Sequence, residues 1–247
     1  MRNDDDVEDP RRRRLVEALT IGAFALGFPS GAVFAQGILG TRPEKLPPNR
    51  SFYRIAGTAS VNGSAATMQT LVRPGDTVET GRESEAIFVV GGHAMILRSE
   101  GRLILEGGRE TARPASWFIS GLRLLTGKLL SVSRDSQLRV TTSTGFMGIR
   151  GTGWYAESAP DLTYFCTCYG TIDITAINDP ESRETVVSKH HDRPLYIIGK
   201  SASGKAIRNA PFINHTDQEL ALIEALVGRA PPFMFPKDDY DGPRRDY

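Results

Sequence analysis

The sequence predicts an all-β protein with one C-terminal helix. Between residues 51 and 200, short apolar runs recur about every ten residues, and Gly, Pro, Asn and Asp separate them. No helical periodicity extends over about eleven residues in this region. The pair Asn62-Gly63 is the strongest short-range signal for a hairpin. Many short strands of even spacing favour a β-solenoid-like or sandwich-like domain.

Composition excludes several classes of function. The 247 residues carry a formal net charge of +1, which gives no overall attraction to nucleic acid or to an anionic membrane. The chain has only two cysteines, too few for a disulfide-rich scaffold. A packed core must therefore stabilise the fold.

Residues 1–35 have the pattern of an export signal. Arg11 to Arg14 form a basic run, an apolar stretch follows, and Val33-Phe34-Ala35 offers a small-residue cleavage site. The pattern predicts a periplasmic protein exported by the Sec or the twin-arginine route. An uncleaved inner-membrane anchor is the alternative, because the apolar stretch approaches spanning length.

The remaining chain divides by composition. Residues 36–50 contain three prolines and form a predicted linker, and residues 51–200 form the β domain. Residues 201–230 are predicted as a loop followed by a helix, with Asn214 or Thr216 as cap and Leu220, Ile223 and Leu226 at helical spacing. Residues 231–247 are rich in proline and charge and are predicted to be disordered.

The densest glycine pattern lies between Gly145 and Gly170. Residues 152–157 and 162–169 are predicted strands around a turn at 158–161. The structural motif of this stretch comprises Gly148, Arg150, Gly151, Thr152 and Gly153, whose glycines indicate unusual dihedral angles or close backbone approach. Arg150 is interpreted as holding backbone carbonyls or a carboxylate such as Asp173 or Glu157; contact with an anion or a partner is the alternative.

Cys166 and Cys168 are the candidate reactive residues. In a strand both sulfurs face the same side, with α-carbons about 6.6 Å apart at ~3.3 Å per residue. Three interpretations follow: two inert buried thiols, a strained or redox-active disulfide, or a site for zinc, copper or haem. A metal needs further ligands, and His190 or His191 is the candidate, since in a strand only one of the two could face the cysteines.

No motif supports catalysis. Residues 151–156 (GTGWYA) fit a dinucleotide-binding pattern, but aromatic residues and Pro160 follow instead of a helix. Gly199-Lys200-Ser201 resembles the end of a phosphate loop, yet Pro194 stands where its first glycine is required. The protein is therefore predicted not to be an enzyme, with no catalytic residues.

An ordered set of segments resembles the FecR domain, the all-β periplasmic module of the iron-dicitrate regulator. The segments are GTASVNG at 57–63, RPGDTVETG at 73–81, SEAIFV at 84–89, Leu122–Leu130 with Gly127-Lys128, and GIRGTG at 148–153. The resemblance covers roughly residues 53–175. It implies a β-solenoid-like fold that senses or relays through protein contacts, without catalytic residues. Only about fourteen residues precede the apolar stretch, so the sigma-regulating role of that family is not carried over.

Two functions are compatible with the sequence. The first is an exported, non-enzymatic FecR-like module that binds an envelope protein or another periplasmic partner. It would bind no nucleic acid, and it would contact the membrane only if residues 1–35 are retained. The second is a metal- or redox-responsive periplasmic binding protein that uses Cys166 and Cys168 with His190 or His191.

Overall fold

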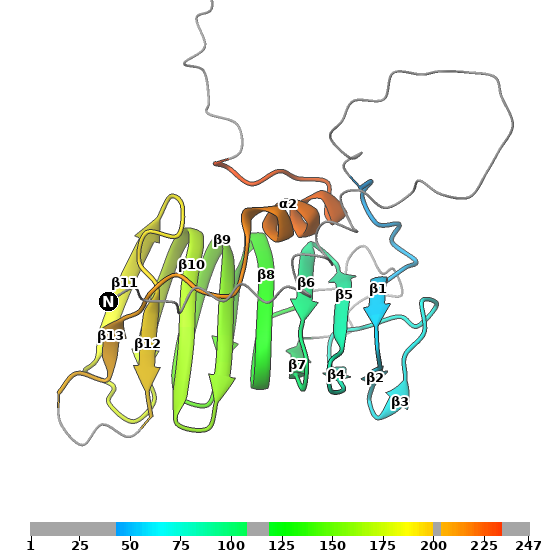
Figure 1. Ribbon diagram of the computed structural model, residues 1–247. Helices are drawn as coiled ribbons and strands as arrows, with labels where there is room; N and C mark the ends of the chain where they lie inside the picture. The colour runs from blue at the N-terminus through cyan, green and yellow to red at the C-terminus, as the bar shows by residue number, and fades with distance from the viewer. Residues whose placement is uncertain (1–42, 108–118, 200–203, 234–247) are drawn as a thin grey trace, which may run out of the picture.

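The computed structural model describes residues 43–107, 119–199 and 204–233, and its fold is all-β with one C-terminal helix, as predicted (Figure 1). The strands are β1 (Phe52–Ala56), β2 (Ala59–Val61), β3 (Ser64–Ala65), β4 (Thr77–Thr80), β5 (Glu85–Val90), β6 (His93–Leu97), β7 (Arg102–Glu106), β8 (Gly121–Thr141), β9 (Gly145–Ala159), β10 (Leu162–Ala176), β11 (Arg183–Ser188), β12 (Leu195–Ile198) and β13 (Ile207–Asn209). The helix is α2 (Asp217–Leu226). The predicted export signal, and the predicted tail from residue 234 onward, lie outside the described residues.

The described strands form one hydrogen-bonded network of antiparallel pairs. Its main path runs β13-β12-β10-β9-β8-β7-β4-β2-β3, while β6, β5 and β1 branch from β8, and β11 branches from β10. The first part of β8 pairs with β7 and its middle with β6. Likewise, β10 pairs with β12 near its start and with β11 further on. The long strands thus belong to two halves of the network.

These two halves enclose the larger hydrophobic cluster, here called the inner core. It joins Phe52, Phe88, Met95, Leu97, Trp154 and Phe165 from one half with Val78, Leu103, Leu122, Val140, Ile172 and Ile174 from the other. Facing sheet halves around a shared core correspond to the sandwich-like form of the prediction. The solenoid-like form is not confirmed, because the described pairings are antiparallel rather than stacked in parallel.

A second cluster, here called the helix-side core, lies between α2 and the other face of the first half. Ile87, Val89, Ala94, Ile96, Leu130, Val132, Tyr155, Tyr164, Cys166, Cys168 and Tyr169 meet Leu220, Ile223, Leu226 and Val227. Side chains of a strand alternate between faces, so Phe88 enters the inner core while its neighbours Ile87 and Val89 face the helix. Figure 1 shows α2 lying across one side of the row of strands.

Local signals explain the ends of these elements. Asn62 (φ 52°) and Gly63 (φ 78°) form the predicted turn between β2 and β3. Thr216 is the N-cap of α2, and a capping box joins it to Glu219. The predicted C-terminal helix is thus confirmed, with Thr216 rather than Asn214 as its cap.

Two glycines of the motif, Gly151 and Gly153, have the unusual dihedral angle or the close contact that the sequence predicts. Gly151 has φ +62°, and a Cβ on Gly153 would lie 2.4 Å from the ring of Tyr169. Gly153 therefore allows the close approach that the sequence predicts, and the Tyr169 ring occupies the space. A Cβ on Gly148 would meet only ordinary contacts, the nearest at 3.8 Å.

One predicted loop is partly a strand. Residues 201–209 lack a strand pattern, yet Ile207–Asn209 forms β13 and pairs with β12. Pairing at a sheet edge supplies backbone hydrogen bonds that sequence periodicity does not reveal. At ten residues, α2 is much shorter than a membrane-spanning helix, and the described part of the chain holds no helix with the length and hydropathy to cross a membrane.

Candidate metal centre

A β-bulge in β10 sets the positions of the two cysteines. Thr167 pairs with Trp154 and Tyr169 with Gly153, so Cys168 is an extra residue in the strand. A bulge re-aims the side chains around it. Cys166 and Cys168 both face the helix-side core, and both are buried free thiols. The shared face predicted from strand alternation is therefore present, and the cysteines do not form the disulfide that the sequence left open.

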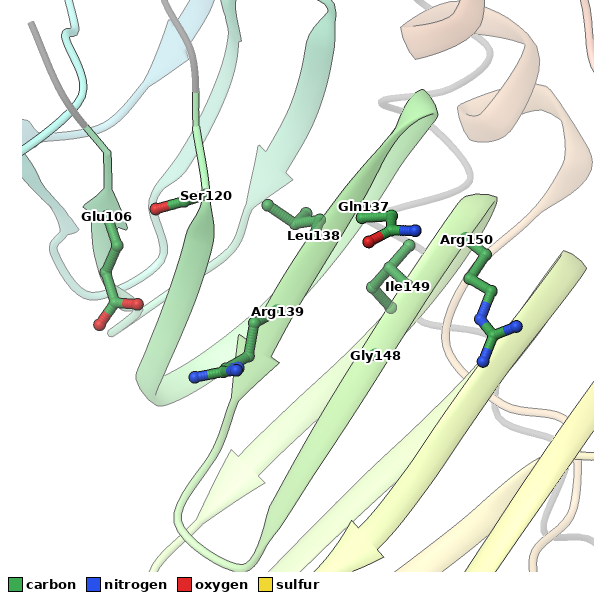
Figure 2. Close-up of a pocket in the computed structure, with 8 residues that line it drawn as sticks. All are labelled: Glu106, Ser120, Gln137, Leu138, Arg139, Gly148, Ile149 and Arg150. Carbon is green, nitrogen blue, oxygen red and sulfur yellow. The ribbon is translucent and has the colours of Figure 1, made fainter.

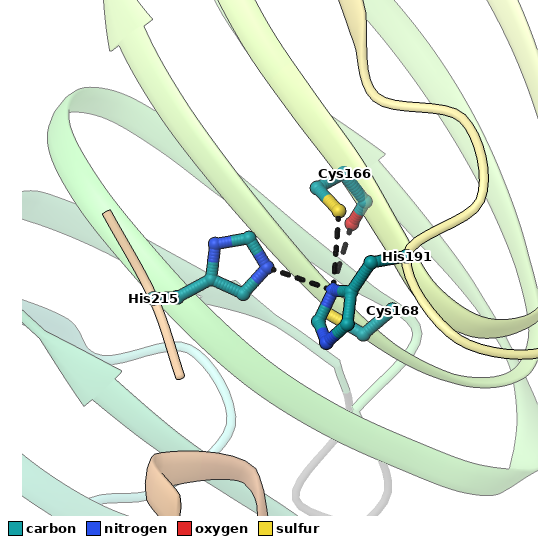
Figure 3. A group of neighbouring side chains, drawn as sticks. All are labelled: Cys166, Cys168, His191 and His215. Carbon is teal, nitrogen blue, oxygen red and sulfur yellow. Dashed lines mark hydrogen bonds between the residues drawn. The ribbon is translucent and has the colours of Figure 1, made fainter. Parts of the chain in front are cut away.

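Two histidines complete a cluster of four donor atoms with these sulfurs (Figure 3). His191 lies in the turn between β11 and β12, and His215 lies just before α2. Nδ1 of His191 is 3.5 Å from Sγ of Cys166 and 3.2 Å from Nε2 of His215. One ligand atom from each of the four residues lies within 4.8 Å of the others. The donor set is Cys₂His₂.

The outward-facing nitrogen of each imidazole is already occupied. Nδ1 of His215 donates to the carbonyl of Ile213 at 2.7 Å, and Nε2 of His191 donates to the carboxylate of Asp217 at 3.0 Å. Carbonyl and carboxylate oxygens accept, so these nitrogens carry the protons of the neutral rings. Two nitrogens with lone pairs then face each other. Such an arrangement requires a proton or a cation between them.

The electrostatics of the cluster favour one thiolate. A hydrogen bond from Cys168, aided by His191 and His215, lowers the pKa of Cys166 to about 4 despite burial. Burial and the neighbouring Cys166 raise the pKa of Cys168. Burial lowers the pKa of His191, but hydrogen bonds to Cys166 and Asp217 outweigh it and raise the pKa overall. Without a metal, the cluster can thus hold a thiolate beside an imidazolium.

The surroundings fix the histidine rings. Tyr155 stacks on His215 with ring centroids 4.5 Å apart, and Phe212 meets His191 at the same centroid distance. His191 and Asn214 have positive φ angles of 53° and 61°. His191 also donates its backbone N–H to the carbonyl of Cys168 at 2.9 Å. Left-handed backbone outside glycine is uncommon and concentrates at functional sites.

The predicted ligand set differs from the observed cluster in one histidine. The structure brings Cys166, Cys168 and His191 together, as the sequence suggested, but the fourth donor is His215. His190 belongs to a neighbouring group with His191 and Asp217, and its Nε2 lies 2.9 Å from the Asp217 carboxylate. One local signal marks His215 in the sequence: it directly precedes a capped helix, a position where the backbone is fixed.

An open groove of about 650 Å³ lies elsewhere, among Glu106, Ser120, Gln137, Leu138, Arg139, Gly148, Ile149 and Arg150 (Figure 2). Arg150 donates to Asp173, as the sequence analysis suggested, and Arg123 lies 3.8 Å from Glu106. Both pairs are solvent-exposed, and exposed pairs contribute little to stability. Two of the three charged residues that line the groove, Glu106 and Arg150, are therefore already paired.

Comparison with known proteins yields only a distant likeness. No protein-family model and no curated protein matches the chain. Two crystal structures, at 2.50 and 1.65 Å resolution, of a protein from Parabacteroides distasonis provisionally described as an anti-sigma factor share 12% identity with it. Each match has a TM-score of 0.41 and covers 54% of this chain and 58% of the other. At these values the likeness indicates neither family membership nor function.

Proposed function

We propose that this protein is a non-catalytic binding module that holds one soft transition-metal ion with Cys166, Cys168, His191 and His215. The observation that carries the proposal is the convergence of these four donors in a buried cluster whose two imidazole nitrogens face each other. Two thiolates and two imidazoles form a closed tetrahedral set typical of structural zinc sites. Copper(I) is the other ion that such sulfur-rich sites favour.

The spacing of the donors supports an ion of this kind. Tetrahedral zinc, with bonds of about 2.0–2.1 Å to nitrogen and about 2.3 Å to sulfur, separates two nitrogens by about 3.3–3.4 Å and a sulfur from a nitrogen by about 3.5–3.6 Å. The corresponding distances here are 3.2 Å and 3.5 Å. These two distances match a tetrahedral site, and the other pairs of donor atoms lie within 4.8 Å of one another. Haem iron takes its remaining ligands from a porphyrin, so four clustered protein donors favour a bare ion.

The second shell also has the form expected around a metal. Ligating histidines usually donate their other N–H to a carboxylate or a backbone carbonyl, which fixes the tautomer. Asp217 has this role for His191, and the carbonyl of Ile213 has it for His215.

A nucleophilic cysteine is the competing function. Cys166, His191 and Asp217 form a chain of the type that cysteine enzymes use to activate sulfur. Cys166 is 0% exposed, however, so a substrate has no access to its sulfur in this arrangement. Beside a nucleophile, Cys168 and His215 would only lower the pKa of Cys166, whereas a metal site uses all four residues as ligands.

The wider setting of the module belongs to the same proposal. The segments that resemble the FecR domain support a module that acts through contacts with an envelope protein or another periplasmic partner. The basic run, apolar stretch and small-residue site in residues 1–35 support export. Metal binding would then make these contacts responsive to the metal content of the periplasm.

Elemental analysis of the full chain, purified from the periplasm without chelator, tests the proposal. We expect one zinc or copper ion per chain, and an intact mass that reports whether residues 1–35 have been removed. Cys166→Ser and His215→Ala should each abolish stoichiometric metal. His190→Gln is the matched control and should retain it, because His190 is not one of the four donors.

Two results would overturn the metal site. One is wild-type protein that contains no metal and binds neither added Zn²⁺ nor Cu⁺, with two thiols that titrate only after unfolding. The other is equal metal loss in His215→Ala and His190→Gln. In the first case Cys166 and Cys168 would be core residues, and in the second case the proposed set of four ligands would be wrong.

A further inference from the structure

The four donors belong to two parts of the molecule that meet in the helix-side core. Cys166 and Cys168 lie in β10, and His191 is tied to that strand by its backbone hydrogen bond to Cys168. His215 belongs to the segment from residue 210 to residue 227, here called the C-terminal segment, which includes α2. An ion bound by all four residues would join this segment to the sheet.

The C-terminal segment is also held by buried charged groups, whose removal from water costs free energy. Arg98 of the sheet side donates to Glu219 at 2.6 Å and to the carbonyl of Asn214. Tyr169 donates to Glu224, which is 0% exposed and also accepts from Arg229 at 2.8 Å. Charged groups lose their hydration when they are buried, and this cost offsets much of the attraction within a buried ion pair. Apolar packing from Leu220, Ile223 and Leu226 must supply the rest.

The helix itself adds little stability. At ten residues, α2 is shorter than the roughly 12–15 residues below which isolated helices are marginal in water. Release from the sheet would therefore also melt the helix. Docking and helix formation are then one cooperative step, and a bound ion would make the free energy of that step more favourable.

We propose that the metal ion clamps the C-terminal segment onto the sheet, so that metal occupancy controls whether the helix-side core is covered. This inference rests on the proposed metal site and adds its regulatory consequence. Loss of the ion would release the segment and uncover an apolar sheet face that includes Ile87, Val89, Ile96, Leu130 and Val132. The inner core, which has no residue in the site, would stay intact.

Asp217 links the clamp to the helix. It is the first residue of α2, and its carboxylate accepts hydrogen bonds from Nε2 of both His190 and His191. Asp217 is thus a positioning residue: it orients a ligand and, in the same contact, holds the start of the helix. Loss of such an outer-shell partner lowers metal affinity about 10- to 100-fold in known sites.

Hydrogen–deuterium exchange on the full chain, loaded with Zn²⁺ or treated with chelator, tests the clamp. If the ion binds only the docked state, free Zn²⁺ at about 100 times its Kd shifts undocking about 100-fold. We therefore expect amides of residues 217–227 to exchange about 100-fold faster after chelation. Amides of β4 and β7, in the inner core, should not change. Cys166→Ser should exchange like chelated wild type under both conditions.

Asp217→Asn tests the positioning role of Asp217 in a second experiment, which measures Zn²⁺ affinity. It should lower Zn²⁺ affinity about 10- to 100-fold, and Asp217→Glu should restore part of it, while unfolding of the metal-free protein is unchanged. His190→Gln is the control, because it removes the other partner of Asp217 and should leave affinity nearly unaltered.

The outcomes separate the two proposals. If the wild type binds no Zn²⁺, the metal site itself is wrong. If it binds one ion but residues 217–227 exchange equally with and without it, the site stands and the clamp is wrong. Unchanged affinity in Asp217→Asn would contradict the positioning role.

Discussion

The two hydrophobic cores differ in what they contain. The inner core is built from aliphatic and aromatic side chains of two facing sheet halves. The helix-side core also holds both cysteines and three tyrosines, and His215, Arg98 and Glu219 are buried at its border. Buried polar groups reduce stability unless they are satisfied. We infer that the inner core supplies most of the apolar stabilisation, while the helix-side core also positions the donors of the proposed metal site.

The largest expected effects come from adjacent residues of β6 that face different cores. Leu97 faces the inner core and Ile96 the helix-side core, and both are at most 1% exposed. Leu97→Ala and Ile96→Ala should each cost about 2–5 kcal/mol in metal-loaded protein, from lost burial and cavity formation. In chelated protein the cost of Leu97→Ala should persist and that of Ile96→Ala should shrink, because the helix no longer covers it. Urea unfolding with and without chelator measures both, and equal behaviour would erase the distinction between the cores.

A smaller effect concerns how folding stability depends on pH through His93, on the face of β6 that points to the inner core. Burial, and then the charge of Arg229, lower the pKa of His93 from 6.5 to about 4, and its ring contacts Ser133 at 3.0 Å. Between these pH values the unfolded chain binds a proton that the folded chain excludes. Stability is therefore fully present above pH 6.5 and falls as the pH drops towards 4, by at most about 3 kcal/mol.

His93→Gln should remove this part of the acid sensitivity. Unfolding free energies of the wild type and the variant, measured from pH 7 to pH 4, should differ at neutral pH and converge at acid pH, because only the wild type loses the contribution of His93 as the pH falls below 6.5. A slope identical to that of the wild type would contradict the prediction. After chelation the part of this slope difference that comes from burial should remain, whereas the part that comes from Arg229, which pairs with Glu224 of α2, should weaken.

The smallest effect concerns the helix cap. The Thr216 hydroxyl accepts a hydrogen bond from the backbone N–H of Glu219, and the Glu219 carboxylate accepts one from the backbone N–H of Thr216. Thr216→Ala should cost about 1 kcal/mol in metal-loaded protein, the usual value of an N-cap. Thr216→Ser should restore it. In chelated protein the difference should vanish, because a released helix has no cap to lose. Thermal unfolding of the wild type and both variants, each with and without metal, provides the measurement.

Much of the architecture was predictable because its signals are local. Alternating apolar residues and the Asn62-Gly63 turn indicate strands, and the sequence Thr216–Glu219 indicates a helix start. Strand β13 was missed, since its three residues gain their structure from pairing with β12 rather than from their own pattern. Two of the four donors, Cys166 and Cys168, were visible for the same local reason: a two-residue spacing within a strand.

The amino-acid sequence alone thus determined the class of fold, the C-terminal helix, and the shared face of Cys166 and Cys168. Only the tertiary structure decided which histidines join them. The bulge at Cys168, the left-handed turn at His191 and the docking of α2 bring His215 into the cluster, and Asp217 holds the remaining nitrogen of His191. These positions depend on packing between segments far apart in the chain, and the spacing of residues along the sequence does not predict such contacts.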